Sequence, residues 1–94
     1  MGFKCDYSID SYDSDDGYRA ARVGTLTSAW NNDNSYAINV VDSYLSGDAL
    51  NQFDLDDIGF YAQWNSNTVE LYCDCSAVPF DCYFNGLFTI FIKP

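Results

Sequence analysis

Apolar and polar residues alternate strictly at the start of the chain. Every second residue from Phe3 to Ile9 is apolar, and the residues between them are polar. A period of two places the two sets on opposite faces of a β-strand, so the pattern predicts a strand over residues 2–10. Residues 18–28 are expected to form a second strand. We expect the two strands to pair as an antiparallel hairpin around the polar, Asp-rich segment 11–17.

The period of the pattern changes after the turn-forming residues 30–34. Between Ser35 and Gly47 the apolar residues recur at spacings of three and four, which is typical of an amphipathic helix. Polar residues at 33–35 suit the helix start, and Gly47 suits its end. The pattern therefore predicts a helix over residues 35–47. A second, shorter helix is expected over residues 48–57, with Leu50 and Phe53 on one face.

The second half of the chain is expected to consist of strands. Residues 58–64 and 68–74 read as two strands around a turn, and two further apolar runs flank the dipeptide Asn85-Gly86. Asn-Gly between apolar runs is typical of a type I′ hairpin turn. Taken together, the elements predict a single α+β domain over residues 1–94. Its antiparallel sheet would have five to six strands, with one or two short helices packed on one face.

The composition narrows the class of protein. The chain has 94 residues and 48% hydrophobic residues, which suits one folded domain and excludes a disordered acidic tail. It has 4 Lys and Arg and no His, so no clustered basic surface is expected for direct binding to nucleic acid or to a membrane. No apolar run approaches the ~20 residues that span a bilayer. No secretory signal is recognised either, so a cytoplasmic location inside a host cell is expected.

The Asp-rich loop from Asp10 to Gly17 resembles a calcium-binding loop only superficially. Aligning Gly17 with the loop glycine places Tyr12 at the first ligand position and Val23 at the twelfth. Both positions need carboxylates, so no tight calcium site is expected. The remaining interpretations are a solvated turn, a weak adventitious cation site or a contact patch for a basic partner.

The cysteines and the second acidic cluster do not form a recognisable catalytic or metal motif. The spacing of Cys5, Cys73, Cys75 and Cys82 fits neither knuckle of a structural zinc site. Free thiols in a reducing compartment are expected, with a disulfide or a metal site as alternatives. The carboxylates at 54–57 could act as acid and base on a sugar, but hydrolases with a sugar cleft are much larger. We therefore expect neither enzyme activity nor a cofactor.

The net charge is the most informative feature of the composition. It amounts to −10, and thirteen of the 14 acidic residues are Asp. Such a charge destabilises a small fold through self-repulsion, while solubility needs only about 2–8 charges. The excess indicates a basic partner or the imitation of a polyanion.

In size, Asp-rich charge and absence of catalytic motifs, the chain resembles the small acidic anti-CRISPR and anti-restriction proteins of phages and mobile elements. Many of these act as DNA mimics. The resemblance implies a non-enzymatic inhibitor, a monomer or a dimer, which binds the basic nucleic-acid groove of a host defence complex, CRISPR–Cas first among them. The residues expected to bind the partner are Asp6, Asp10, Asp13, Asp15, Asp16, Asp54, Asp56 and Asp57, with Tyr12 and Tyr18 at the rim.

Two other functions stay open at this stage. The chain has eight Tyr, seven Phe and two Trp, and Tyr and Trp are enriched at protein interfaces. The protein would then be a structural or accessory interaction domain, for example of a virus. The four cysteines also fit a small secreted disulfide protein.

Overall fold

The computed structural model describes residues 1–13, 18–30, 38–48, 55–65, 68–78 and 81–91. Within these ranges the regular elements are β-strands and one short 3-10 helix, η1. In chain order they are β1 (Gly2–Asp13), β2 (Tyr18–Trp30), β3 (Ile38–Asp48), η1 (Leu55–Asp57), β4 (Gly59–Asn65), β5 (Thr68–Asp74) and β6 (Cys82–Phe91).

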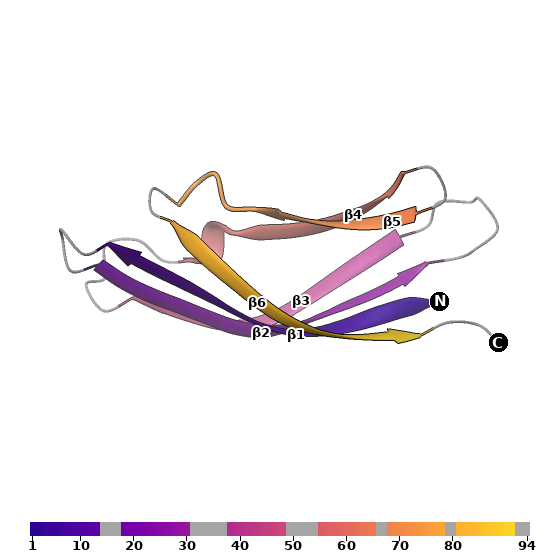
Figure 1. The fold of residues 1–94 in the computed structure, drawn as a ribbon, viewed down its shortest axis with the longest axis horizontal. Coiled ribbons are helices and arrows are strands. Elements are labelled where there is room, and N and C mark those ends of the chain that lie inside the picture. The colour runs from indigo at the N-terminus through magenta and orange to yellow at the C-terminus, as the bar shows by residue number, and fades with distance from the viewer. Residues whose placement is uncertain (14–17, 31–37, 49–54, 66–67, 79–80, 92–94) are drawn as a thin grey trace.

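The strands form two antiparallel sheets that pack as two layers. The larger sheet has the order β3-β2-β1-β6, and β4 and β5 form a separate hairpin. Figure 1 shows this hairpin lying over one face of the curved larger sheet. We call that face the inner face and the opposite one the outer face. The molecule measures 49 × 20 × 16 Å, and its long axis follows the strands.

The central strand β1 has the alternation that its sequence predicts. Its odd-numbered residues from Phe3 to Ser11 are buried on the inner face, while Lys4, Asp6 and Asp10 are exposed on the outer face. The predicted hairpin of β1 and β2 is confirmed, with pairs running from Gly2 and Ala29 to Asp13 and Tyr18. The predicted pair of β4 and β5 is confirmed as well.

The core lies between the two layers. Its buried members come from β1, β2, η1, the residue between η1 and β4, and the segment that follows β5. Partly buried side chains of β3 to β6 pack against them. Burial of each large aliphatic or aromatic side chain contributes roughly 1.5–3 kcal/mol. The buried members are Cys5, Tyr7, Ile9, Ala20, Leu26, Leu55, Ile58 and Val78.

The predicted helix over residues 35–47 is wrong, and with it the α+β fold class: the described fold is all-β. Residues 38–48 form strand β3, which pairs with β2 from Trp30–Ile38 to Ala20–Asp48; residues 35–37 lie outside the described part. The helical spacing arose because β3 is an edge strand with apolar residues on both faces. Val40 and Tyr44 pair with inner-face residues of β2, whereas Val41 and Leu45 lie on the outer face.

The shorter predicted helix over residues 48–57 is replaced by the single turn of η1. Asp48 is the last residue of β3, and the helix Leu55–Asp57 has three residues. Residues 49–54, which include Leu50 and Phe53, lie outside the described part. Leu55 is buried and anchors η1 in the core.

The predicted turn at Asn85-Gly86 is also wrong, because β6 continues through it. Gly86 pairs with Tyr7 of β1, and Tyr7 pairs on its other side with Gly24 of β2. A Cβ atom on Gly86 would lie 2.8 Å from the Phe84 ring and 2.9 Å from Cys5 Sγ, and one on Gly24 would lie 2.8 Å from the Tyr7 hydroxyl. Both glycines therefore make room for aromatic side chains on the inner face, which is a known use of glycine within strands.

This packing predicts opposite outcomes for two glycine substitutions. Gly24→Ala should lower the free energy of unfolding by about 1–3 kcal/mol, because the added methyl group would overpack the Tyr7 side chain and the Ser43 carbonyl. Gly47→Ala is the matched control, since nothing lies within 4 Å of its added Cβ atom. It should leave stability unchanged or raise it slightly. Denaturant unfolding measures both, and equal losses would contradict the packing argument.

Candidate partner-binding surface

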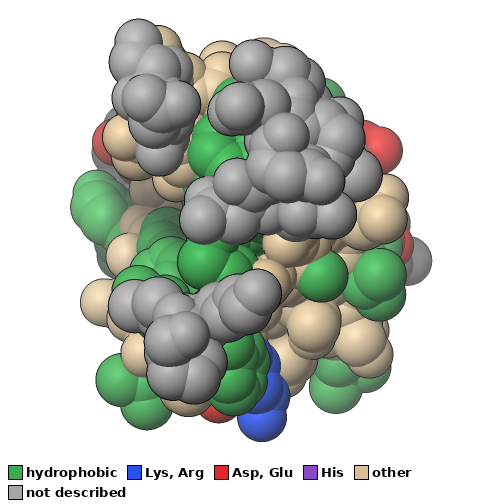
Figure 2. All heavy atoms as spheres, turned by 90° about the vertical axis from the view of Figure 1, so that its right-hand side faces the viewer, with side chains coloured by type: hydrophobic (Ala, Val, Ile, Leu, Met, Phe, Trp, Pro, Cys, Tyr) green, Lys and Arg blue, Asp and Glu red, His purple; other side chains and the backbone are tan. Residues whose placement is uncertain are grey.

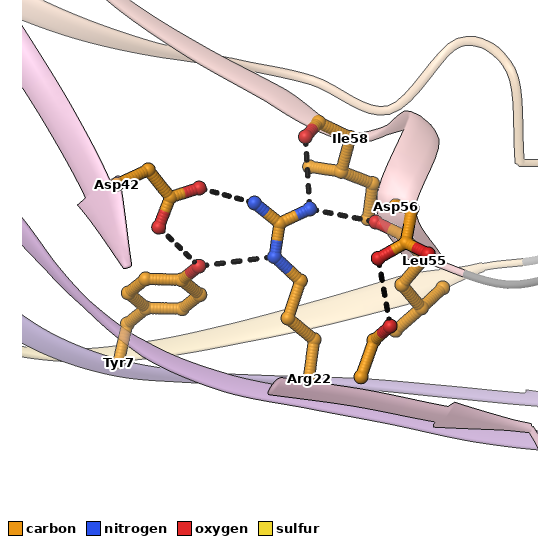
Figure 3. A network of polar contacts seen from close by, with 7 residues as sticks. Tyr7, Arg22, Asp42, Leu55, Asp56 and Ile58 are labelled. Carbon is orange, nitrogen blue, oxygen red and sulfur yellow. Dashed lines mark hydrogen bonds and ion pairs between the residues drawn. The ribbon is translucent and has the colours of Figure 1, made fainter. Parts of the chain in front are cut away.

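One buried charged network lies between the two layers, around Arg22 of β2. The Arg22 side chain is 1% exposed, and its Nη2 forms an ion pair with Asp42 of β3 (Figure 3). Its Nε donates to the Tyr7 hydroxyl at 3.0 Å, which in turn donates to Asp42 Oδ1 at 2.8 Å. Its Nη1 donates to the carbonyl oxygens of Leu55 at 2.6 Å and Ile58 at 2.8 Å.

The network is suited to holding the fold rather than to reacting. A buried charge is tolerated when it is paired and its donors are hydrogen-bonded, and Arg22 meets this condition with partners from three separate segments. Its guanidinium also lies 3.6 Å from the centre of the Tyr44 ring, a cation–π contact. Burial and the hydrogen bond to Asp42 raise the pKa of Tyr7 to about 12. All these groups are engaged with one another, so the network is an internal link between the layers.

The raised pKa of Tyr7 predicts a loss of stability in strong base. The folded state holds the phenol proton more tightly than the unfolded state, so the contribution is complete below about pH 10 and disappears as the pH rises to about 12. A shift of about two units corresponds to about 2–3 kcal/mol. Urea unfolding across this pH range should show a steeper decline for the wild type than for Tyr7→Phe. The control Tyr83→Phe, on the outer face, should decline like the wild type; parallel curves for all three would contradict the assignment.

Two of the predicted partner-binding residues lie together on the outer face of β1. Asp6 and Asp10 are both exposed and are four residues apart, which is roughly 13 Å along a strand. Asp6 accepts a hydrogen bond from Thr25 Oγ1 at 2.9 Å and lies 4.0 Å from Lys4 Nζ. An exposed pair of this kind contributes little to stability, so the Asp6 carboxylate remains available at the surface.

Two more predicted residues lie on the inner-face side, in η1. Asp56 and Asp57 are exposed, and Asp56 accepts a hydrogen bond from Ser46 Oγ at 2.8 Å. Asp56 is also hydrogen-bonded to the Tyr44 hydroxyl, and this bond raises the pKa of Tyr44. The structure therefore does not bring the η1 carboxylates onto the same face as Asp6.

Only some of the other predicted partner-binding residues lie in the part of the chain that the structure describes. Tyr12 is exposed near the end of β1. Asp15, Asp16 and Asp54 lie outside the described residues. The backbones of Asp13 and Tyr18 are paired at the tip of the β1–β2 hairpin, but their side chains lie outside the description as well.

Although the acidic residues do not share a face, many share one end of the long axis. Asp10 and η1 lie toward the end where β1 finishes, and the backbones of Asp13 and Asp48 end their strands there. Two exposed acidic residues that the sequence analysis missed also lie here: Asp74, the last residue of β5, and Asp81 in the connection to β6. A 3.1 Å hydrogen bond from Ser11 Oγ to the Asp81 carbonyl fixes this connection beside β1. We call the following exposed residues the acidic end: Asp10, Asp56, Asp57, Asp74 and Asp81.

The opposite end of the described structure has a different character. Its described charged groups are Lys4, the amino group of Met1 and Glu70, whose pKa is lowered by hydrogen bonds from Tyr72 and Asn65. Between the layers lies an apolar cleft of about 380 Å³, and Figure 2 shows hydrophobic side chains gathered around a hollow at this end. The lining includes Phe3, Trp30, Trp64, Leu71, Phe88 and Ile90. Charge is thus distributed unevenly along the long axis.

The thiols and carboxylates of the described residues form no metal-binding group. All four cysteines are free thiols, with Cys5 buried and Cys73 and Cys75 exposed. Among the described residues, no three His, Cys, Asp or Glu side chains converge as metal ligands. The same part of the chain contains no helix with the length and hydropathy needed to cross a membrane.

Comparison of the chain with protein-family models, with curated proteins and with solved structures gives no match.

Proposed function

We propose that this protein is a non-enzymatic inhibitor that binds the basic nucleic-acid groove of a host defence complex, CRISPR–Cas first among them, through its acidic end. One observation carries the proposal: exposed carboxylates from four separate segments of the sequence lie toward one end of a 49 Å molecule. The described acidic residues outside this end are Asp6 in the middle of β1, the partly buried Asp42 that pairs with Arg22, and Glu70.

The acidic end has properties that suit a nucleic-acid groove. Such grooves are lined with Lys and Arg that neutralise phosphates. Carboxylates can take the place of phosphates there, and opposite charge accelerates the encounter of the two partners. Asp10 lies within a paired strand, and η1 is held by Arg22 through the Leu55 and Ile58 carbonyls. Little order has to be gained on binding, which reduces its entropic cost.

A second function is supported by exposed aromatic and apolar side chains on both sheets, which we call the aromatic surface. On the outward face of the hairpin, Tyr61 and Tyr72 stack with their ring centres 5.0 Å apart, and several large apolar side chains are exposed on the other sheet. An interaction domain that binds through these groups would not compete with nucleic acid. Competition therefore separates the two proposals.

Charge reversal at the acidic end should weaken binding strongly. The double variant Asp10→Lys/Asp57→Lys would set like charges against the groove, and such opposition costs several kcal/mol, or roughly a hundredfold in affinity. Asp6, which the sequence analysis counted among the partner-binding residues, lies outside the acidic end. Asp6→Lys/Glu70→Lys is therefore the matched control, because it changes the net charge equally but away from that end. Its affinity should fall only a few-fold, through the loss of long-range attraction. The measurement is the dissociation constant for a purified CRISPR–Cas effector complex at two salt concentrations.

Wild-type binding should weaken steeply as salt rises, and DNA and this protein should exclude each other from the effector. Equal losses in the two double variants would assign the effect to net charge alone. Simultaneous binding of DNA and this protein would contradict the mimic proposal and favour the aromatic surface.

A further inference from the structure

Strand β6 is an edge strand without the usual protection against pairing. In the larger sheet it pairs with β1 on one side, and its other side is an edge of the sheet. Its ten residues, Cys82–Phe91, include no charged residue and no proline. Natural edge strands are normally guarded by charged side chains, proline, bulges or a covering segment, because a bare edge pairs readily with another strand.

Both faces of β6 expose large apolar side chains. On the outer face these are Tyr83, Leu87 and Phe91, and in the alternate, inner-face positions they are Phe84, Phe88 and Ile90. Their exposed fractions run from 41% to 71%. The Phe84 ring still contacts Phe60 of the hairpin, with ring centres 6.0 Å apart, whereas Phe88 and Ile90 line the open apolar cleft.

The opposite edge of the same sheet is built differently. Strand β3 contains Asp42 and Asp48, and both η1 and β4 pack against it. The hairpin thus has its backbone contacts with the larger sheet on the β3 side, and no described strand pairs with the free edge of β6. The contrast between the two edges marks β6 as the edge from which the sheet can be extended.

We infer that β6 pairs with β6 of a second copy of this chain, in antiparallel orientation around a two-fold axis. The two larger sheets then form one continuous eight-stranded sheet, and each copy contributes the same patch, as in the common symmetric dimers. The strand pairs satisfy the edge N–H and C=O groups, and the apolar side chains of the two copies cover one another on both faces.

The exposed side chains of β6 supply a large part of the area that such an interface needs. A buried aromatic side chain accounts for roughly 150–250 Å², so six large apolar side chains with about half of their surface exposed offer several hundred Å² per copy. A standard stable interface buries about 800 Å² per partner. The backbone edge and neighbouring residues of β1 and β6 supply the remainder.

The distribution of charge favours a second copy as the occupant. Two chains of charge −10 repel each other, but β6 itself is uncharged. Antiparallel pairing also places the acidic end of one copy beside the apolar end of the other, so the two acidic ends lie far apart. Because the edge of β6 has no charged side chain, it cannot favour a charged partner through charge complementarity. A second copy presents the same uncharged, apolar edge.

The test is the molar mass in solution, by light scattering and sedimentation velocity, from low to high micromolar concentration. Wild type should have twice the chain mass of 10.6 kDa at high concentration. Leu87→Lys should raise the dimer dissociation constant by about a hundredfold, because residue 87 and its symmetry mate lie close together at the centre of the paired strands. Thr89→Lys, in the next outer-face position of β6, should act in the same direction.

Leu45→Lys is the matched control. Leu45 and Leu87 both lie on the outer face of an edge strand, with exposed fractions of 74% and 71%, but on opposite edges. Because both side chains are exposed, both variants should keep the wild-type circular dichroism and unfolding midpoint, and Leu45→Lys should remain dimeric. A monomeric wild type at every concentration would overturn the inference, as would dimers of both β6 variants or equal dissociation of Leu45→Lys. Added salt should preserve the dimer while it weakens binding to the defence complex, so the two proposals can fail separately.

Discussion

The buried guanidinium of Arg22 is the interaction on which the two-layer structure depends. It links Tyr7 of β1 and Asp42 of β3 to the carbonyl oxygens on either side of η1. Removal of one partner from a buried ion pair costs about 3–5 kcal/mol, because the other charge stays buried without compensation. A domain of 94 residues has a total stability of about 5–14 kcal/mol. The link is therefore a large part of what keeps the hairpin on the sheet.

The same link determines where two carboxylates of the proposed binding surface lie. Two of the five bonds that Arg22 and Tyr7 make in this network go to the backbone of η1 and the residue after it, so η1 is fixed against β2 and β3. Asp56 and Asp57 are carried by this turn, and β4 begins directly after it. An arrangement that holds a core together thus also brings acidic residues from distant segments to one end. The Arg22 network is thus required both for the fold and for the proposed function.

The sequence predicted the elements whose signals are local. The alternation in β1 and the short turn between β4 and β5 depend on neighbouring residues, and those strands were found. It failed at β3 and at Gly86, where the cause is tertiary. Apolar residues on both faces of an edge strand imitate a helical period, and Gly86 is required by the Phe84 ring and Cys5 Sγ rather than by a turn. The acidic residues Asp74 and Asp81 were missed for a related reason, since their place depends on the return of β6 beside β1.

The placement of charge argues that the acidic residues serve more than solubility. A protein that uses charge against aggregation places it on bare strand edges, where association begins. The 94-residue chain has 14 acidic residues, yet β6 contains none. This strand nevertheless exposes large apolar side chains along its whole length. Most of the exposed carboxylates in the described part of the chain lie instead toward the end of the strands, where edge pairing does not occur. Such a distribution is consistent with both proposals, in which the uncharged edge pairs with a second copy and the acidic end binds a positively charged surface.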